Sequence, residues 1–107
     1  MVSRWHQFDV FANPDKRSAE THPYLIVLQS EAVAGIETCV VAPLVSSRSI
    51  KFLERMLPEV TVKGTRYSVL TPNMAAIRVD KIGKAICNLE VERYRLIAAI
   101  DLVFVGI

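Results

Sequence analysis

An apolar run near the N-terminus, YLIVL at residues 24–28, is the clearest structural signal in this chain. The run is too short for a helix, and an unbroken apolar stretch of this length is typical of a β-strand covered on both faces. A second run, CVVAPL at residues 39–44, has the same character, and Pro43 within it indicates a strand end or an edge. The two runs predict buried strands joined by an exposed connection, residues 29–35, which carries apolar residues at its tip.

Shorter strand patterns lie on either side of these runs. Residues 8–11 form a β-like run, which is stopped by the turn sequence NPD at residues 13–15 and followed by a polar loop. Apolar and polar residues alternate from 60 to 69 around Gly64, which predicts a β-hairpin. The same alternation at residues 77–80 predicts one more half-buried strand. These patterns favour a predominantly antiparallel sheet.

Helical spacing occurs twice. Three apolar residues between positions 46 and 57 predict a short helix that ends before Pro58. From about Glu90 onward, apolar residues recur at steps of three and four, which predicts a C-terminal helix with one apolar stripe. Glu90 and Glu92 are expected in its first turn, where the helix dipole favours negative charge, and Gly106 is expected to end it. The stripe consists of Leu96, Ile97, Ile100, Val103, Phe104 and Ile107.

Size and composition exclude several classes of protein. A chain of 107 residues has room for one core, so we expect one domain over residues 1–107. Thirteen basic residues against eleven acidic ones give a charge of +2, too small and too scattered to indicate direct nucleic-acid binding. No stretch is long and apolar enough to span a membrane, and the N-terminus lacks the apolar core of a signal peptide. We therefore expect a cytoplasmic protein.

The residues that carry enzyme chemistry do not converge in the sequence. His6 and His22 have no metal-ligating residue at zinc spacing, and Cys39 and Cys87 each lie in apolar surroundings that indicate buried free thiols. The four glycines are isolated, so no phosphate-binding loop or nucleophile elbow is present. We expect no catalytic residue, no metal and no cofactor.

The last seven residues, DLVFVGI at 101–107, place apolar side chains where chain ends are usually polar. One interpretation is that Phe104 and Ile107 complete the buried stripe of the helix. The other is that the helix end forms an apolar protrusion that enters a partner, because contiguous exposed apolar surface marks interaction sites. The pattern alone leaves both interpretations open.

Four segments in register resemble one family of proteins. The ending AIDLVFVGI at residues 99–107 resembles the C-terminus of CcdB-type gyrase toxins, which finish in a helix and a terminal Gly-Ile. YLIVLQSE at 24–31, VVAPL at 40–44 and TPNMA at 71–75 resemble the family's apolar strand with Gln-Ser-acid, its Pro-Leu strand end and its Thr-x-x-Met segment. Order and spacing hold from about residue 7 to residue 107, which covers nearly the whole chain.

The resemblance implies a fold and a function. It implies an antiparallel barrel related to SH3 domains and MazF toxins with a C-terminal helix, assembled as a homodimer. It implies a toxin that catalyses nothing, inserts into the A subunit dimer of DNA gyrase and traps it with cleaved DNA attached. It also implies a CcdA-type antitoxin that inhibits the toxin. Residues 13–20 and 46–55 are the candidate docking surfaces for this antitoxin. The gyrase-contacting positions carry over to Ala32, Val33, Asp101, Phe104, Val105, Gly106 and Ile107.

One departure from the family pattern concerns the target contact. Val105 stands where the family often has a Trp that stacks on an Arg of gyrase. Loss of a cation–π contact of about 0.5–2 kcal/mol weakens binding by roughly two- to thirtyfold per site. Two alternatives therefore stay open: a weakened or non-toxic relative that serves as a binding module, and a MazF-like endoribonuclease on the same fold.

Overall fold

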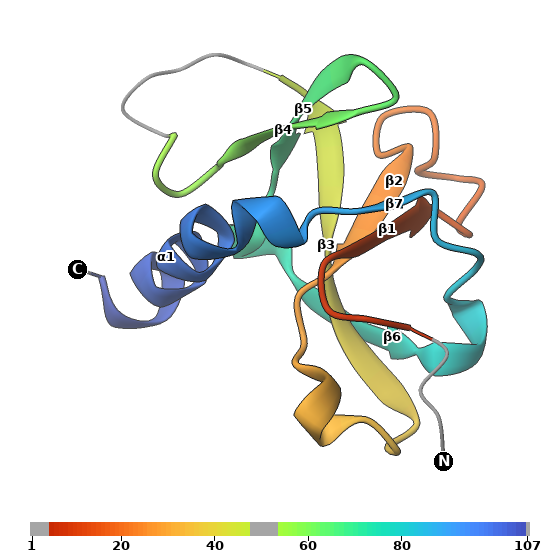
Figure 1. Ribbon diagram of the computed structural model, residues 1–107. Coiled ribbons are helices and arrows are strands. Elements are labelled where there is room, and N and C mark those ends of the chain that lie inside the picture. The colour runs from red at the N-terminus through yellow and green to blue at the C-terminus, as the bar shows by residue number, and fades with distance from the viewer. Residues whose placement is uncertain (1–4, 48–53, 107) are drawn as a thin grey trace.

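The computed structural model describes residues 5–47 and 54–106 of the chain. Within this part, an antiparallel sheet curls into a nearly closed barrel, and one helix follows at the C-terminal end (Figure 1). The predicted fold class, a mainly β barrel with a C-terminal helix, is confirmed. The strands are β1 (Asp9–Ala12), β2 (Tyr24–Val27), β3 (Thr38–Ser46), β4 (Glu59–Val62), β5 (Thr65–Val69), β6 (Ala75–Arg78) and β7 (Cys87–Asn88). The helix is α1 (Arg93–Val105), and the 3-10 turns are η1 (Glu31–Val33), η3 (Thr71–Asn73), η4 (Val79–Lys81) and η5 (Glu90–Glu92).

The sheet is organised around β3, its longest described strand. The strand order is β4-β5-β3-β2-β1-β7, and β6 pairs with β3 outside this path. The N-terminal half of β3 pairs with β6, where Cys39 lies opposite Ile77, and its C-terminal half pairs with β5, where Leu44 lies opposite Val69. β3 thus has β2 along one flank and two different strands along the other.

Strand β2 is covered on both faces, as its apolar run predicts. Ile26 is fully buried in the larger core, into which α1 inserts Leu96. Leu25 and Val27 point to the opposite face and pack in a second core with Trp5. Both faces of the strand therefore exclude water, which is why its sequence shows no alternation.

The interpretation of Pro43 as a strand end or an edge is wrong. Pro43 lies inside β3, opposite Leu25 of β2. Its carbonyl accepts a hydrogen bond of 2.9 Å from the Leu70 N–H, on the flank where pairing changes from Val41 with β6 to Leu44 with β5. A residue in a strand directs its N–H and C=O to the same side. The donor that proline lacks therefore falls at the gap between two partner strands, where no ladder bond is required.

Other boundaries are confirmed in part. The hairpin is present, with β4 and β5 joined by Lys63 and Gly64. The strand at residue 77 ends at Arg78, because Val79 already starts η4. Of the helix expected over 46–57, Ser46 belongs to β3, residues 54–56 form a turn, and residues 48–53 lie outside the described residues.

The C-terminal helix starts later than predicted. Glu90 and Glu92 belong to η5, a separate 3-10 turn, and α1 itself starts at Arg93. The Glu92 N–H donates to the carbonyl of Leu89 at 2.9 Å, a bond across three residues that tightens the chain before the α-helix. The expectation that both acids lie in the first α-helical turn is therefore wrong by one turn.

Candidate functional site

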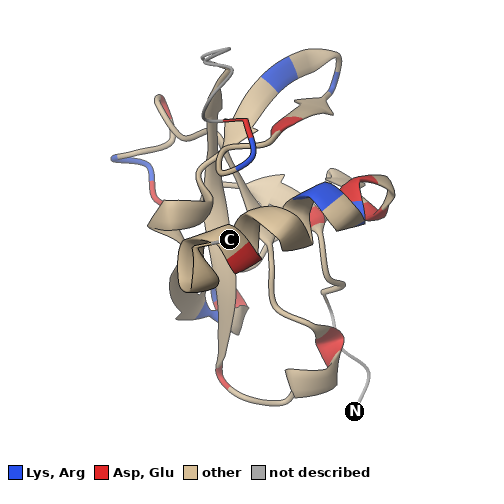
Figure 2. Ribbon diagram, turned by 90° about the vertical axis from the view of Figure 1, so that its left-hand side faces the viewer, with Lys and Arg blue, Asp and Glu red and all other residues tan. Residues whose placement is uncertain are grey.

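The end of α1 exposes the apolar side chains that the sequence singled out. Leu96 and Ala99 are fully buried against the barrel, whereas Phe104 is 71% and Val105 64% exposed. Figure 1 shows the C-terminal end of the helix directed away from the sheet. The interpretation that Phe104 completes a buried stripe is wrong, since its ring lies mostly in solvent. Apart from Asp101, the last two turns carry no charged residue (Figure 2).

Gly106 ends this helix as predicted, and its backbone explains the residue type. Its φ of 82° is left-handed, and its N–H donates to the carbonyl of Leu102 at 3.0 Å. A side chain at this φ is strained, so glycine is the natural residue after a helix end of this kind. Ile107, the last predicted contact residue, lies outside the described residues.

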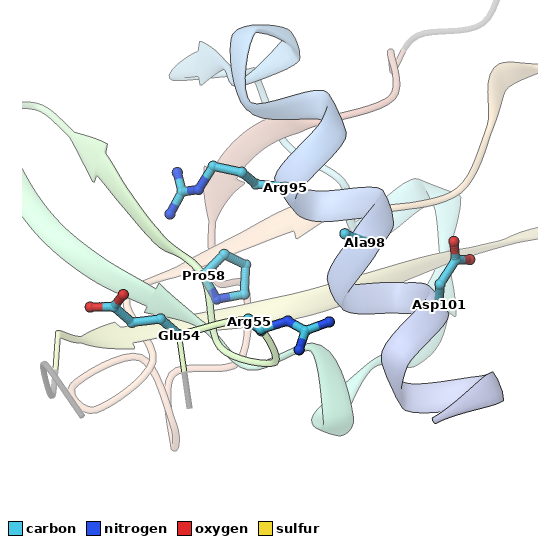
Figure 3. Close-up of a pocket in the computed structure, with 6 residues that line it drawn as sticks. All are labelled: Glu54, Arg55, Pro58, Arg95, Ala98 and Asp101. Atoms are coloured by element: carbon cyan, nitrogen blue, oxygen red, sulfur yellow. The ribbon is translucent and has the colours of Figure 1, made fainter. Parts of the chain in front are cut away.

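Asp101 borders an open groove beside the apolar tip. The groove has a volume of about 360 Å³ and lies between α1 and the chain before β4. It is lined by Glu54, Arg55, Pro58, Arg95, Ala98 and Asp101 (Figure 3). In Figure 3 the Arg55 side chain extends toward α1, whereas Glu54 extends away from it. The groove therefore has a lining of mixed charge, and it reaches Asp101, three residues before Phe104 in the chain.

The Arg95 side chain on the groove wall is held in place. One guanidinium nitrogen donates to the Glu92 carboxylate at 2.7 Å and the other to the Glu59 carbonyl at 2.9 Å. The bond to Glu59 ties α1 to the start of β4. Two hydrogen bonds therefore fix the position of the Arg95 guanidinium on the groove wall.

The second predicted group, Ala32 and Val33, lies on the η1 turn. Both residues are exposed, Val33 by 51%. The turn is held by its neighbours: the Ser30 hydroxyl accepts from the Ala32 N–H at 3.1 Å, and the Gln29 amide donates to the Val33 carbonyl at 3.3 Å. The expected exposed connection with an apolar tip is thus present.

Glu31 in the same turn reaches outward to another segment. Its carboxylate accepts from the backbone N–H of Gln7 at 3.0 Å and lies 3.3 Å from the His6 ring nitrogen. The hydrogen bond from Gln7, and then that from His6, holds the pKa of Glu31 below its usual value. This carboxylate and its partners were missed by the sequence analysis, because no local pattern marks a contact between residues 24 positions apart.

One protomer does not bring the two predicted groups together. The η1 turn and the end of α1 lie apart in both views (Figures 1 and 2). Asp101, Phe104, Val105 and Gly106 form one group at the helix end, and Ala32 and Val33 form another. The candidate site therefore consists of two separate surfaces on each chain.

The described residues offer little for catalysis or metal binding. Among residues 5–47 and 54–106, no group of three His, Cys, Asp or Glu side chains could hold a metal ion. Both cysteines are free, Cys39 buried as expected and Cys87 only partly buried. Burial raises the pKa of the Cys39 thiol to about 11, so it stays neutral and unreactive at physiological pH.

No helix in the described part of the chain has the length and apolar character needed to cross a membrane.

The sequence model of the CcdB protein family matches residues 7–106. Comparison with curated protein sequences finds no match. The matched residues include the whole barrel, the η1 turn and α1 up to Gly106.

Proposed function

Because the chain belongs to the CcdB family, the gyrase-poisoning toxins of toxin–antitoxin systems, we propose that it binds the A subunit of DNA gyrase and traps the enzyme with cleaved DNA attached. The family is not one of catalytic enzymes. The proposed action is accordingly mechanical: the toxin holds its target in one state and makes or breaks no covalent bond itself.

One observation carries this proposal, namely the exposed apolar end of α1. A phenylalanine that is 71% exposed and a valine that is 64% exposed stand side by side on a helix end that projects from the barrel. Exposed apolar side chains of this kind are costly in water and mark places where a partner binds. Aromatic residues also dominate the binding energy of protein interfaces. Phe104 is therefore the proposed anchor, with Val105, Gly106 and Ile107 around it.

The proposed assembly is a homodimer with two-fold symmetry. A two-fold dimer presents each helix end and each η1 turn twice, which suits a target that is itself a two-fold dimer. Ala32 and Val33 are proposed to contact gyrase from the η1 turn. Direct contact of the toxin with nucleic acid is not part of the proposal, in keeping with a charge of only +2.

A CcdA-type antitoxin is the proposed second partner. Such antitoxins carry disordered tails that fold on the toxin. The loop over residues 13–20 is exposed over most of its length and is one proposed docking surface. Much of the other, residues 46–55, lies outside the described residues.

Val105 favours a second candidate, a weakened member of the family. The family often has Trp at this position, and Val offers apolar contact without a ring to stack on an Arg. Growth of a gyrase-sensitive bacterium that expresses the chain separates the two candidates. Growth arrest supports the toxin, whereas unimpaired growth with soluble protein confirmed supports a non-toxic binding module.

The binding proposal is tested by capture of a gyrase A fragment. We expect the full chain to capture the fragment and a chain ending at Val105 to lose capture. Phe104→Ala should weaken affinity by about tenfold or more, as for a typical anchor residue. Tyr94→Ala is the matched control, because Tyr94 is an aromatic residue of the same helix, 86% exposed at the other end. Equal capture by all these chains would count against the proposed site.

A chain ending at Phe104 tests the ribonuclease alternative. RNA degradation by the purified chain that survives removal of residues 105–107 would favour a MazF-like activity over gyrase binding. We expect no degradation above that of a mock purification.

A further inference from the structure

The η1 turn has very little packing to fix its shape. Every residue from Ser30 to Thr38 is exposed, and no side chain of the turn is buried. Apolar burial, which fixes the strands, therefore contributes little to the orientation of Ala32 and Val33. A segment that must present a fixed surface to a partner then depends on hydrogen bonds that reach beyond itself.

Glu31 makes a contact of this kind with residues outside the turn. It directly precedes Ala32, and its side chain leaves the turn to accept the Gln7 N–H at 3.0 Å and to approach the His6 ring at 3.3 Å. This contact joins the turn to the chain just before β1. The Ser30 bond shapes the turn locally, and the Gln29 amide links it to the Val40 N–H of β3. Among the contacts of the described residues, the Glu31 carboxylate is the one that joins the turn to residues 6 and 7.

The backbone that Glu31 holds is itself fixed at several points. The Gln7 side-chain amide donates to the Leu28 carbonyl at 3.0 Å and accepts from an Arg93 guanidinium nitrogen of α1 at 3.0 Å. The Gln7 carbonyl accepts from the Asn88 amide of β7 at 3.0 Å. One residue therefore connects the end of β2, the start of α1, β7 and, through Glu31, the η1 turn.

The next residue keeps this junction rigid. Phe8 is fully buried and has a φ of 70°, and its N–H donates to the Val27 carbonyl at 2.7 Å. The Arg93 guanidinium lies 5.7 Å from the centre of the Phe8 ring. Gln7 is thus anchored between a buried ring and a helix, which makes its N–H a stationary partner for Glu31.

We infer that Glu31 is a positioning residue, whose carboxylate holds the η1 turn, and with it Ala32 and Val33, against the Gln7 junction at the start of α1. This inference rests on the proposed function in that Ala32 and Val33 are taken to contact gyrase. Glu31 itself acts through the turn and does not touch the target.

The test compares Glu31→Ala with Glu31→Gln. Alanine removes the acceptor, whereas glutamine keeps a side-chain oxygen that can still accept from the Gln7 N–H. Glu37→Ala, the loss of an exposed glutamate on the same connection but outside η1, is the matched control. For each chain we would measure the dissociation constant for the gyrase A fragment and the amide hydrogen exchange of residues 32–34.

Glu31→Ala is expected to weaken binding about three- to tenfold, since the turn must then be ordered on binding. It should also speed exchange at residues 32–34 while leaving β2 and β3 unchanged. Glu31→Gln should stay within about twofold of the wild type in both measurements, and Glu37→Ala should match the wild type. This pattern separates an orienting role from a general loss of stability.

Two outcomes would overturn the inference. Unchanged exchange at residues 32–34 in Glu31→Ala means that the carboxylate does not hold the turn, even if binding weakens, since Glu31 then contacts the target directly. Faster exchange with unchanged binding means that the turn needs no positioning. If the wild type itself fails to bind the fragment, the proposed function falls, and exchange alone then decides whether Glu31 anchors the turn.

Discussion

Phe8 combines full burial with a left-handed backbone, a φ of 70°. A bulky residue at positive φ is a genuine outlier, which surrounding structure must hold in place at a cost of about 1–3 kcal/mol. Here the buried ring contributes the compensating energy. The position therefore couples a stabilising side chain to a destabilising backbone.

This coupling predicts an unusual order of mutant stabilities. Phe8→Ala should lower the free energy of unfolding by about 3–5 kcal/mol, since it removes a buried ring. Phe8→Gly should be at least as stable as Phe8→Ala, because glycine relieves a left-handed strain of about 1–2 kcal/mol that alanine keeps. Urea denaturation of both variants measures the difference.

Phe11 provides the control for this prediction. It is fully buried like Phe8 but lies within β1, and it is not among the described residues with positive φ. There Phe11→Gly should be less stable than Phe11→Ala by about 0.5–1 kcal/mol, the usual order in a strand. The strain argument is wrong if positions 8 and 11 give the same order.

Val105 is the second residue with a specific prediction. Val105→Trp should tighten binding to the gyrase A fragment by roughly two- to thirtyfold, because a ring at this exposed position can stack on a cationic side chain. Titration calorimetry measures the gain, and Val91→Trp is the control, since Val91 is 87% exposed at the opposite end of the helix region. An equal gain in affinity from both variants would indicate non-specific hydrophobic binding rather than a contact at the helix end.

Among the secondary-structure elements, the β4–β5 hairpin has a strained turn that a substitution could relieve. Its two loop residues have positive φ, 50° at Lys63 and 78° at Gly64, which is the geometry of a type I′ turn. Asn is preferred at the first of these positions, whereas Lys is strained there. Lys63→Asn should therefore raise the free energy of unfolding by about 0.5–1 kcal/mol.

Thermal unfolding tests the hairpin prediction. Thr61→Asn is the control, an exposed position of β4 where Asn has low strand propensity and should be neutral or slightly destabilising. A higher melting temperature for Lys63→Asn alone supports the turn argument. No change at Lys63 would mean that the turn relaxes at no cost.

The strands and the helix also show which structural features local sequence patterns could predict and which they could not. β2 and the hairpin were predicted correctly because burial on two faces and alternation around Gly64 are local patterns. Pro43 was misinterpreted because its missing donor is tolerated only where β5 and β6 leave a gap on one flank of β3, a fact of topology. The late start of α1 depends on a 3-10 turn that apolar periodicity does not resolve.

The candidate site divides in the same way. The exposure of Phe104 was one of two interpretations that the sequence left open, because the helical stripe does not show where the barrel ends. The roles of Gln7 and Glu31 could not be anticipated, since hydrogen bonds between segments far apart in the chain leave no periodic trace. The positive φ of Phe8 gave no sequence signal either, because phenylalanine is not a residue that favours such a backbone.

The whole molecule, finally, is small for a chain that folds alone. A chain of 107 residues buries a modest share of its surface alone, so association would stabilise it. The proposed two-fold target would add a functional reason for pairing, because one dimer can engage both halves of it at once.

Light scattering at micromolar concentration should therefore give twice the 12.0 kDa mass of one chain. The melting temperature should rise with protein concentration, because dissociation accompanies unfolding of a dimer. The captured complex should contain two toxin chains for each gyrase A dimer, since both two-fold axes then coincide. A mass of one chain together with undiminished capture would contradict the proposed geometry, because a single helix end would then suffice to hold the target.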